Sequence, residues 1–196
     1  MTLNDLPELE SVLATAIHKL NQVPIAWLLG GSCSLLLQDV TLDKPPRDID
    51  IYTDAGGVQS LHESLAFMAV DAPRLDQEGI YSSILSHYEI EKVPIELVGG
   101  FEVNSNGSSY CVEIDPLLYP AAPESHIQGV TVRLMPLSHE LVFNVLRDRP
   151  DRYNAIAEAI LRDMDQHMPL LQQLLSRNRL SVEHRTVLNR LIGLQP

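Results

Sequence analysis

Two stretches of the chain decide the fold: Trp27-Leu-Leu-Gly-Gly-Ser32 and, further along, Arg47-Asp-Ile-Asp-Ile51. In the first, the short apolar run 25–29 is typical of a strand that is buried on both faces. Gly30 and Gly31 then end the strand, and Ser32 stands where the N-cap of a helix belongs. The stretch therefore predicts a strand, a glycine turn and a helix in direct succession.

The second stretch alternates polar and apolar residues, as a half-buried strand does. Because residues i and i+2 of a strand point to the same face, Asp48 and Asp50 are predicted to present their carboxylates side by side. Carboxylate oxygens are the hard ligands that Mg²⁺ prefers. Backbone N–H groups at the glycine turn, with the Ser32 hydroxyl, are suited to phosphate. The two stretches together predict a site for a metal-bound nucleotide.

The remaining N-terminal sequence predicts alternating helices and strands. Helical periodicity covers residues 6–20 and about 58–69, and strand patterns cover 81–98 and 130–134. After Pro136 the pattern becomes wholly helical, with Ser138, Asp151 and Ser181 as predicted helix caps. The expected fold is α/β with a small mixed sheet flanked by helices. The expected domains are an α/β domain over 1–135 and a helical C-terminal region over 136–196.

The charge is strongly acidic but unevenly distributed. The 196 residues carry a formal net charge of −12. Residues 1–146 hold 6 Lys and Arg against 20 Asp and Glu, whereas residues 147–196 hold 8 against 6. Sequence-independent binding to nucleic acid depends on Lys and Arg that neutralise phosphates, so nucleic acid is not the expected partner. The acidic part suits a cation, and the Arg-bearing tail suits anionic groups.

Neither a membrane nor a disulfide framework is indicated. The N-terminal residues lack a basic region, and no apolar run reaches the ~20 residues that span a bilayer. Cys33 and Cys111 lie far apart and have no metal-like spacing, so both are expected to be buried free thiols. A cytoplasmic location is predicted.

The order of the motifs resembles minimal members of the nucleotidyltransferase superfamily over about residues 25–98. The matching residues are Gly30-Gly31-Ser32, then Arg47-Asp48-Ile-Asp50, then Glu96 within Ile95-Glu-Leu97. The resemblance implies Gly30, Gly31, Ser32 and Arg47 as nucleotide-binding residues. It further implies Asp48, Asp50 and Glu96 as catalytic residues and as ligands of Mg²⁺ or Mn²⁺.

Two features leave residue assignments open. The family often has Asp where this chain has Glu96, and Glu89 and Glu91 lie in the same strand-rich stretch. In related enzymes a helix marked by Lys, Arg and Asp closes over the nucleotide. Here the usual Lys–Asp pairing is absent, and Arg149, Asp151 and Arg152 take its place in the sequence.

The function that the resemblance implies is transfer of a nucleoside monophosphate from an NTP to a hydroxyl of a small molecule. The expected partners are the NTP and a small hydroxylated acceptor. One alternative is a toxin-like member that modifies protein or tRNA. Another is a non-catalytic member that binds a nucleotide or a partner.

Overall fold

The structure is a computed structural model, and it describes residue 2 and residues 5–193. Its helices are α1 Pro7–Leu20, α2 Gly31–Leu37, α3 Val58–Leu65, α4 Leu137–Leu146, α5 Pro150–Arg162, α6 Met164–Arg177 and α7 Val182–Leu191. Its strands are β1 Trp27–Gly30, β2 Ile49–Thr53, β3 Arg74–Asp76, β4 Tyr81–Ile90, β5 Val93–Ser105, β6 Ser108–Cys111, β7 Glu124–Ile127 and β8 Val130–Arg133. Four short helical turns connect them: η2 Ala55–Gly57, η3 Ala66–Met68, η4 Ile114–Leu118 and η5 Tyr119–Ala121.

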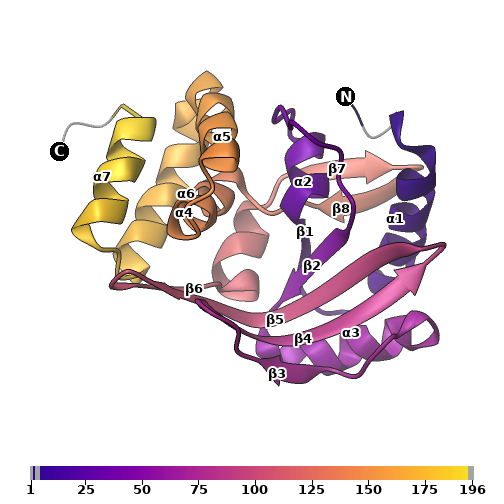
Figure 1. The fold of residues 1–196 in the computed structure, drawn as a ribbon. Coiled ribbons are helices and arrows are strands. Elements are labelled where there is room, and N and C mark those ends of the chain that lie inside the picture. The colour runs from indigo at the N-terminus through magenta and orange to yellow at the C-terminus, as the bar shows by residue number, and fades with distance from the viewer. Residues whose placement is uncertain (1, 3–4, 194–196) are drawn as a thin grey trace.

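A mixed sheet forms the middle of the molecule (Figure 1). Its strand order is β1-β2-β5-β4-β3, and β6 pairs with the far end of β5. The β2–β5 pair is parallel and the other pairs are antiparallel. The separate β7–β8 hairpin reaches β1 through a parallel bridge between Leu29 and Leu134. The predicted small mixed sheet flanked by helices is confirmed.

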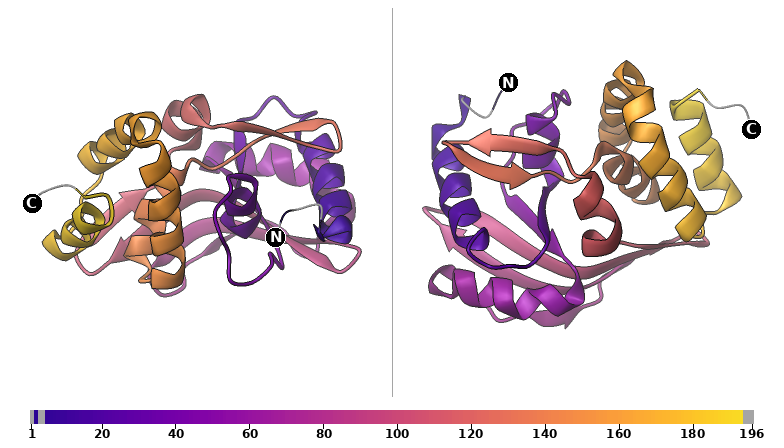
Figure 2. Two further views of the ribbon diagram at one scale, coloured as in Figure 1. Left: turned by 90° about the horizontal axis from the view of Figure 1, so that it is seen from above. Right: turned by 180° about the vertical axis from the view of Figure 1, so that it is seen from behind.

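The two faces of the sheet bury different sets of side chains, because strand residues alternate in direction. Ile49 and Ile51 of β2 pack with the apolar faces of α1 and α3. The opposite face carries Asp50 and Tyr52, and Tyr52 belongs to a second apolar cluster shared with α4–α7. Figure 2 shows the C-terminal helices gathered at one end of the sheet, away from α1. Asp50 and Tyr52 therefore face the space between the sheet and the C-terminal helices.

The helix α4 is the centre of the C-terminal helices. Every residue of Leu137–Leu146 is buried, and α4 packs against α5, α6 and α7. The large apolar cluster also includes Leu28 and Leu35 from the N-terminal part. The division at residue 135 into two domains stays a prediction.

Several local expectations require correction. The helix α2 begins at Gly31 with Gly30 as its cap, so Ser32 lies within the first turn. Ser138 does not cap α4 but donates to the carbonyl of His167, and α5 begins after Arg149 without a side-chain cap from Asp151. The Ser181 cap is confirmed by the bond from His184 N to Ser181 Oγ. Cys33 is buried as expected, whereas Cys111 is exposed, because alternate side chains of the edge strand β6 face solvent.

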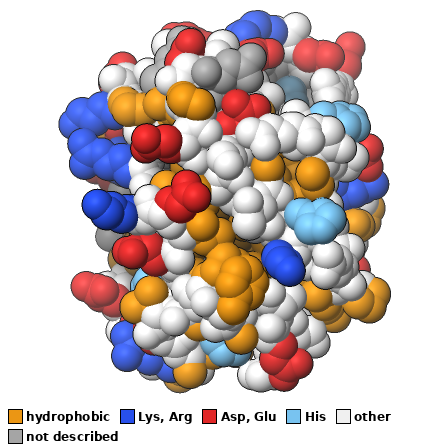
Figure 3. Space-filling view, turned by 90° about the vertical axis from the view of Figure 1, so that its right-hand side faces the viewer, with side chains coloured by type: hydrophobic (Ala, Val, Ile, Leu, Met, Phe, Trp, Pro, Cys, Tyr) orange, Lys and Arg blue, Asp and Glu red, His pale blue; other side chains and the backbone are white. Residues whose placement is uncertain are grey.

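The face that carries α1 shows acidic and basic side chains interspersed, with hydrophobic side chains between them (Figure 3). Phe67, Val70 and Leu75 are exposed beyond the C-terminal end of α3. Within residue 2 and residues 5–193, no helix is both long and apolar enough to cross a membrane.

Candidate active site

The glycine turn joins β1 to α2 and lies against β2. Gly31 has φ +58°, a left-handed conformation that glycine adopts without strain. A Cβ atom on Gly31 would collide with the Asp50 carboxylate, and one on Gly30 would collide with the ring of Tyr52. The two glycines therefore allow the turn to approach β2 closely, which brings the start of α2 next to Asp50.

The predicted carboxylates lie together at this turn. Asp50 is in β2 directly opposite Gly30 of β1, and Asp48 immediately precedes β2. Burial raises the pKa of Asp50 to about 8, and the negative charges of Asp48, Glu96 and Glu140 add to that effect while Arg147 opposes it. The environment of Asp50 therefore favours its neutral form unless a cation binds beside it.

Glu96 lies one strand further across the sheet. It pairs in parallel register with Asp50, so both side chains lie on the same face. Glu96 is half-buried, and burial raises its pKa, with further contributions from Asp48 and Asp76 that His87 opposes. Glu89 is exposed and Glu91 lies in the β4–β5 turn with φ +50°. Of these three glutamates, Glu96 is the one next to the aspartate pair.

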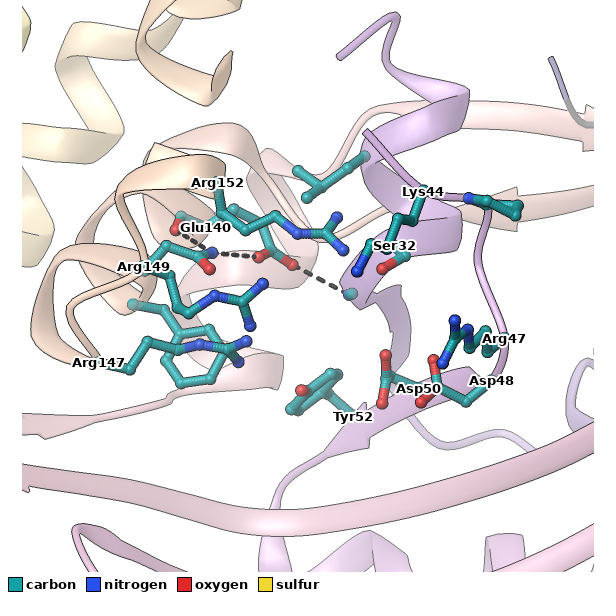
Figure 4. A pocket seen from close by; sticks show the side chains of 15 residues that line it. Ser32, Lys44, Arg47, Asp48, Asp50, Tyr52, Glu140, Arg147, Arg149 and Arg152 are labelled. Atoms are coloured by element: carbon teal, nitrogen blue, oxygen red, sulfur yellow. Dashed lines mark hydrogen bonds between the residues drawn. The ribbon is translucent and has the colours of Figure 1, made fainter. Parts of the chain in front are cut away.

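A wall of basic side chains faces the carboxylates across a cavity of about 330 Å³ (Figure 4). Arg147, Arg149 and Arg152 approach it from the ends of α4 and α5, and Lys44 and Arg47 lie on the side of Asp48. Arg149 forms a bidentate ion pair with Asp151. Burial lowers the pKa of Arg152, and its Nη1 atom is buried without a hydrogen-bond partner. The three arginines thus form one side of the cavity, and the other side holds both carboxylates together with Lys44 and Arg47.

Glu140 of α4 is a site residue that the sequence analysis missed. It is 3% exposed, and its Oε1 accepts from the backbone N–H of Gly31 at 3.1 Å, while its Oε2 accepts from Asn144 Nδ2 at 3.2 Å. Burial raises the pKa of Glu140 to about 7, against the opposing effects of the Gly31 N–H, Arg147, Asn144 and Arg152. The N–H of Gly31, which was expected to face phosphate, is therefore occupied by a carboxylate. One signal was available: Glu140 lies four residues before Asn144 and seven before Arg147, so helical spacing places the three on one face.

A second cavity of about 360 Å³ adjoins the first. Asp50, Tyr52, Phe143, Arg147 and Arg149 line both. The second cavity adds two carboxylates, Asp76 and Glu96, and an aromatic wall in which the Tyr81 and Phe101 rings stack with centroids 5.8 Å apart. Asp50 thus stands at the junction of a basic compartment and an aromatic one.

The acidic pair fits a divalent cation by its donor chemistry. Asp48 and Asp50 offer hard oxygen atoms, and burial, the main cause of the raised pKa of Asp50, disfavours its charged form unless a cation binds beside it. Within the described part of the chain, no three His, Cys, Asp or Glu side chains are grouped as a ready set of metal ligands. Glu96 as a third ligand therefore stays a prediction, as do the metal roles of Asp48 and Asp50.

Comparison with known proteins shows which solved structures have a similar fold. No protein-family model matches the chain, and no curated protein matches its sequence. Among solved structures, a candidate nucleotidyltransferase from Thermotoga maritima, TM1012, is 18% identical, with 82% of this chain and 94% of that chain covered and a TM-score of 0.60. ANT(2'')-Ia in complex with adenylyl-2''-tobramycin is 13% identical, with 87% and 98% covered and a TM-score of 0.52. The solution structure of the antibiotic-resistance factor ANT(2'')-Ia is 15% identical, with 86% and 94% covered and a TM-score of 0.50.

These likenesses establish a nucleotidyltransferase-like fold. They cover 82–87% of this chain and 94–98% of each compared chain.

Proposed function

We propose that the protein is a metal-dependent nucleotidyltransferase that moves a nucleoside monophosphate from an NTP to a hydroxyl of a small molecule. The observation that carries the proposal is the pair Asp48 and Asp50 facing Arg147, Arg149 and Arg152 across one cavity. A carboxylate pair opposite a cluster of arginines is the arrangement that a metal-bound polyphosphate needs.

The basic compartment is suited to the triphosphate. Guanidinium groups bind phosphate oxygens with paired N–H donors. The Nη1 of Arg152 is a buried donor without a partner, which is costly unless an acceptor arrives. Ser32 adds a hydroxyl at the first turn of α2, and Arg47 and Lys44 add positive charge on the opposite side. These residues form the proposed nucleotide-binding set together with Gly30 and Gly31.

Asp48 and Asp50 would hold Mg²⁺ or Mn²⁺, and such an ion would supply positive charge to stabilise the negative charge on the phosphate oxygens. The carboxyl of Asp50 binds it only when ionised, so the cation and the proton compete for this group. Positive charge for the nucleotide would thus come from two sources: the cation held by Asp48 and Asp50 on one side of the cavity, and the three arginines on the other.

The aromatic compartment is suited to the acceptor. Its volume of about 360 Å³ is that of a site for a small molecule. An acceptor hydroxyl placed there lies beside Glu96, which takes its proton. The new bond forms between the hydroxyl oxygen and the α-phosphorus, the bond from that phosphorus to the pyrophosphate oxygen breaks, and pyrophosphate leaves on the side of the arginines.

Two further points support a small acceptor. ANT(2'')-Ia, which shares the fold, is seen in complex with adenylyl-2''-tobramycin, a small molecule that carries an adenylyl group. The net charge of −12 disfavours nucleic acid as acceptor.

The test is label transfer from each of the four α-³²P-labelled NTPs in the presence of Mg²⁺. The acceptor panel contains aminated and neutral hydroxylated small molecules, with tRNA and a protein extract as separate arms. We expect labelled small molecules from the parent protein and none from the Asp48→Asn, Asp50→Asn double variant. Labelled tRNA or protein would instead support the toxin-like alternative, and nucleotide binding without transfer in any arm would support the non-catalytic one.

A further inference from the structure

Glu140 joins two parts of the site that come from distant segments of the chain. Its backbone belongs to α4, the buried helix that ends just before Arg147, and its carboxylate reaches Gly31 in the turn between β1 and α2. A carboxylate in a buried position is unfavourable unless its oxygens are bonded. Here both oxygens are, one to Gly31 N and one to Asn144 Nδ2. The position of the carboxylate is therefore fixed from two sides.

Gly31 transmits that position to Asp50. The two residues are so close that even one methyl group on Gly31 would collide with the Asp50 carboxylate. A shift of the turn by a few tenths of an ångström toward β2 would displace that carboxylate, and a shift away would open a gap beside it. The bond from Gly31 N–H to Glu140 sets where the turn lies between these limits.

We propose that Glu140 is a positioning residue of the transfer reaction: its bond to Gly31 fixes the glycine turn against Asp50 and thereby aligns the carboxylate side of the cavity with the arginine side. The inference rests on the proposed function. The proposal requires the Glu140 side chain to be long enough to accept from the Gly31 N–H, so its length matters more than its charge. Glu140 acts through Gly31 and Asp50 and does not contact the reacting atoms.

Two variants separate reach from charge. Glu140→Asp keeps the charge but is one methylene too short for the Gly31 N–H. Glu140→Gln keeps the length and an oxygen that accepts from Gly31. It loses the charge and the bond from Asn144 Nδ2, because the amide nitrogen cannot accept a hydrogen bond. Ser138→Ala is the matched control, because it removes one buried hydrogen bond, to the carbonyl of His167, from the same helix outside the cavity.

Three quantities are measured on each variant: binding of Mn²⁺ with an NTP by the loss of the free Mn²⁺ signal in electron paramagnetic resonance, single-turnover transfer, and hydrogen exchange of the Gly31 amide. For Glu140→Asp we expect faster exchange at Gly31 and a loss of about 10- to 100-fold in Mn²⁺ affinity or transfer rate, which is the usual effect of removing a group that orients a metal ligand. Glu140→Gln and Ser138→Ala are expected to stay close to the parent protein in all three.

Four results would overturn the inference. The first is parental transfer and Mn²⁺ binding by Glu140→Asp, and the second is a loss in Glu140→Gln as large as in Glu140→Asp, which would assign the effect to charge. The third is tighter NTP binding by Glu140→Asp, which would mean that the carboxylate blocks a phosphate position. The fourth is a loss in Ser138→Ala that matches the loss in Glu140→Asp, which would reduce Glu140 to general helix stability.

Failure of the proposed function has a different signature. In that case the parent protein itself neither binds Mn²⁺ with NTP nor transfers label. The exchange rate of the Gly31 amide still shows in that case whether Glu140 fixes the turn. Should Glu140→Asp fail to fold, Glu140→Gln decides, since a loss of transfer in this variant contradicts a role based on reach.

Discussion

Replacing Asp50 by Asn is expected to stabilise the metal-free protein. The pKa of Asp50 is raised to about 8 in the folded state, against 3.8 for the ordinary group. The folded state therefore holds a proton that the unfolded state releases between these pH values. The free energy of unfolding accordingly falls as the pH rises from about 4 to about 8, and the loss levels off above the folded pKa.

The size of the effect follows from the pKa difference. Each pH unit within the window costs about 1.4 kcal/mol, which gives roughly 4 kcal/mol at pH 7 as an upper value for this one group. Relaxation and entry of water reduce it, so we expect Asp50→Asn to raise the free energy of unfolding by about 2–4 kcal/mol at pH 7–8 without metal. At pH 4 the difference should shrink to about 0.6 kcal/mol, because Asp50 is then protonated in the folded state and about 40% protonated in the unfolded state.

The assay is urea denaturation at pH 4, 5.5, 7 and 8 with EDTA. A second series contains Mg²⁺ and an NTP, which should recover stability in the parent protein only. Glu158→Gln, on the exposed face of α5, is the control and should change the free energy of unfolding by less than about 0.5 kcal/mol at every pH. A gain for Asp50→Asn that is absent at pH 8, or equal at pH 4 and pH 8, would refute the reasoning.

The remaining predictions concern the other walls of the site. Glu96→Gln should leave the Kd for the NTP almost unchanged and lower single-turnover transfer by about 10² to 10⁴; transfer at the parental rate would remove Glu96 from the mechanism. Arg152→Met should weaken NTP binding in calorimetry by about 10- to 100-fold, because a charged hydrogen bond contributes about 1.5–3 kcal/mol; the exposed Arg190→Met is its control, and equal affinities would contradict a phosphate role. Gly31→Ala should destabilise the fold by at least about 1 kcal/mol through its positive φ and abolish Mn²⁺ binding. Gly56→Ala has open space around the new methyl group and should do neither, so equal behaviour of the two variants would argue against the close turn.

The glycine turn and the aspartate strand could be predicted from the sequence because their signals are local. An apolar run, two adjacent glycines and an alternating Asp-Ile-Asp pattern each lie within a few residues. The short strand β3 was not predicted, because two of its three residues are exposed and its pairing depends on β4 rather than on its own pattern. The helix caps at Ser138 and Asp151 were wrong because each helix begins one residue before the predicted cap. Both side chains lie in the first turn and bond to the His167 carbonyl and to Arg149 instead.

The composition of the site was only partly visible. Asp50 and Glu96 are neighbours because β2 and β5, which are distant in sequence, pair in parallel register. The sequence motif indicated both carboxylates but not their relative position. Glu140 was missed because its partner, Gly31, lies in a distant segment of the chain. Helical periodicity alone does not tell whether a single Glu in a helix is buried at a site or exposed to solvent. The sequence indicates Arg149 and Arg152 as replacements for the usual Lys–Asp pairing. That they meet at one cavity depends on how α4 and α5 pack, which the sequence pattern does not reveal.

The parallel pairing of β2 with β5 also governs how the protein acquires its chemistry. Parallel neighbours require a long crossover, and here residues 54–92 lie between the two strands. A nascent chain that has emerged only as far as residue 92 contains the glycine turn and both aspartates but lacks the strand that supplies Glu96, and the arginines follow later still. Contacts between residues so distant in sequence form slowly, because the chain loses the entropy of loop closure before the contacts stabilise it. Competence for nucleotide is therefore a property of the completed chain, and its appearance during refolding would mark the end of folding rather than its beginning.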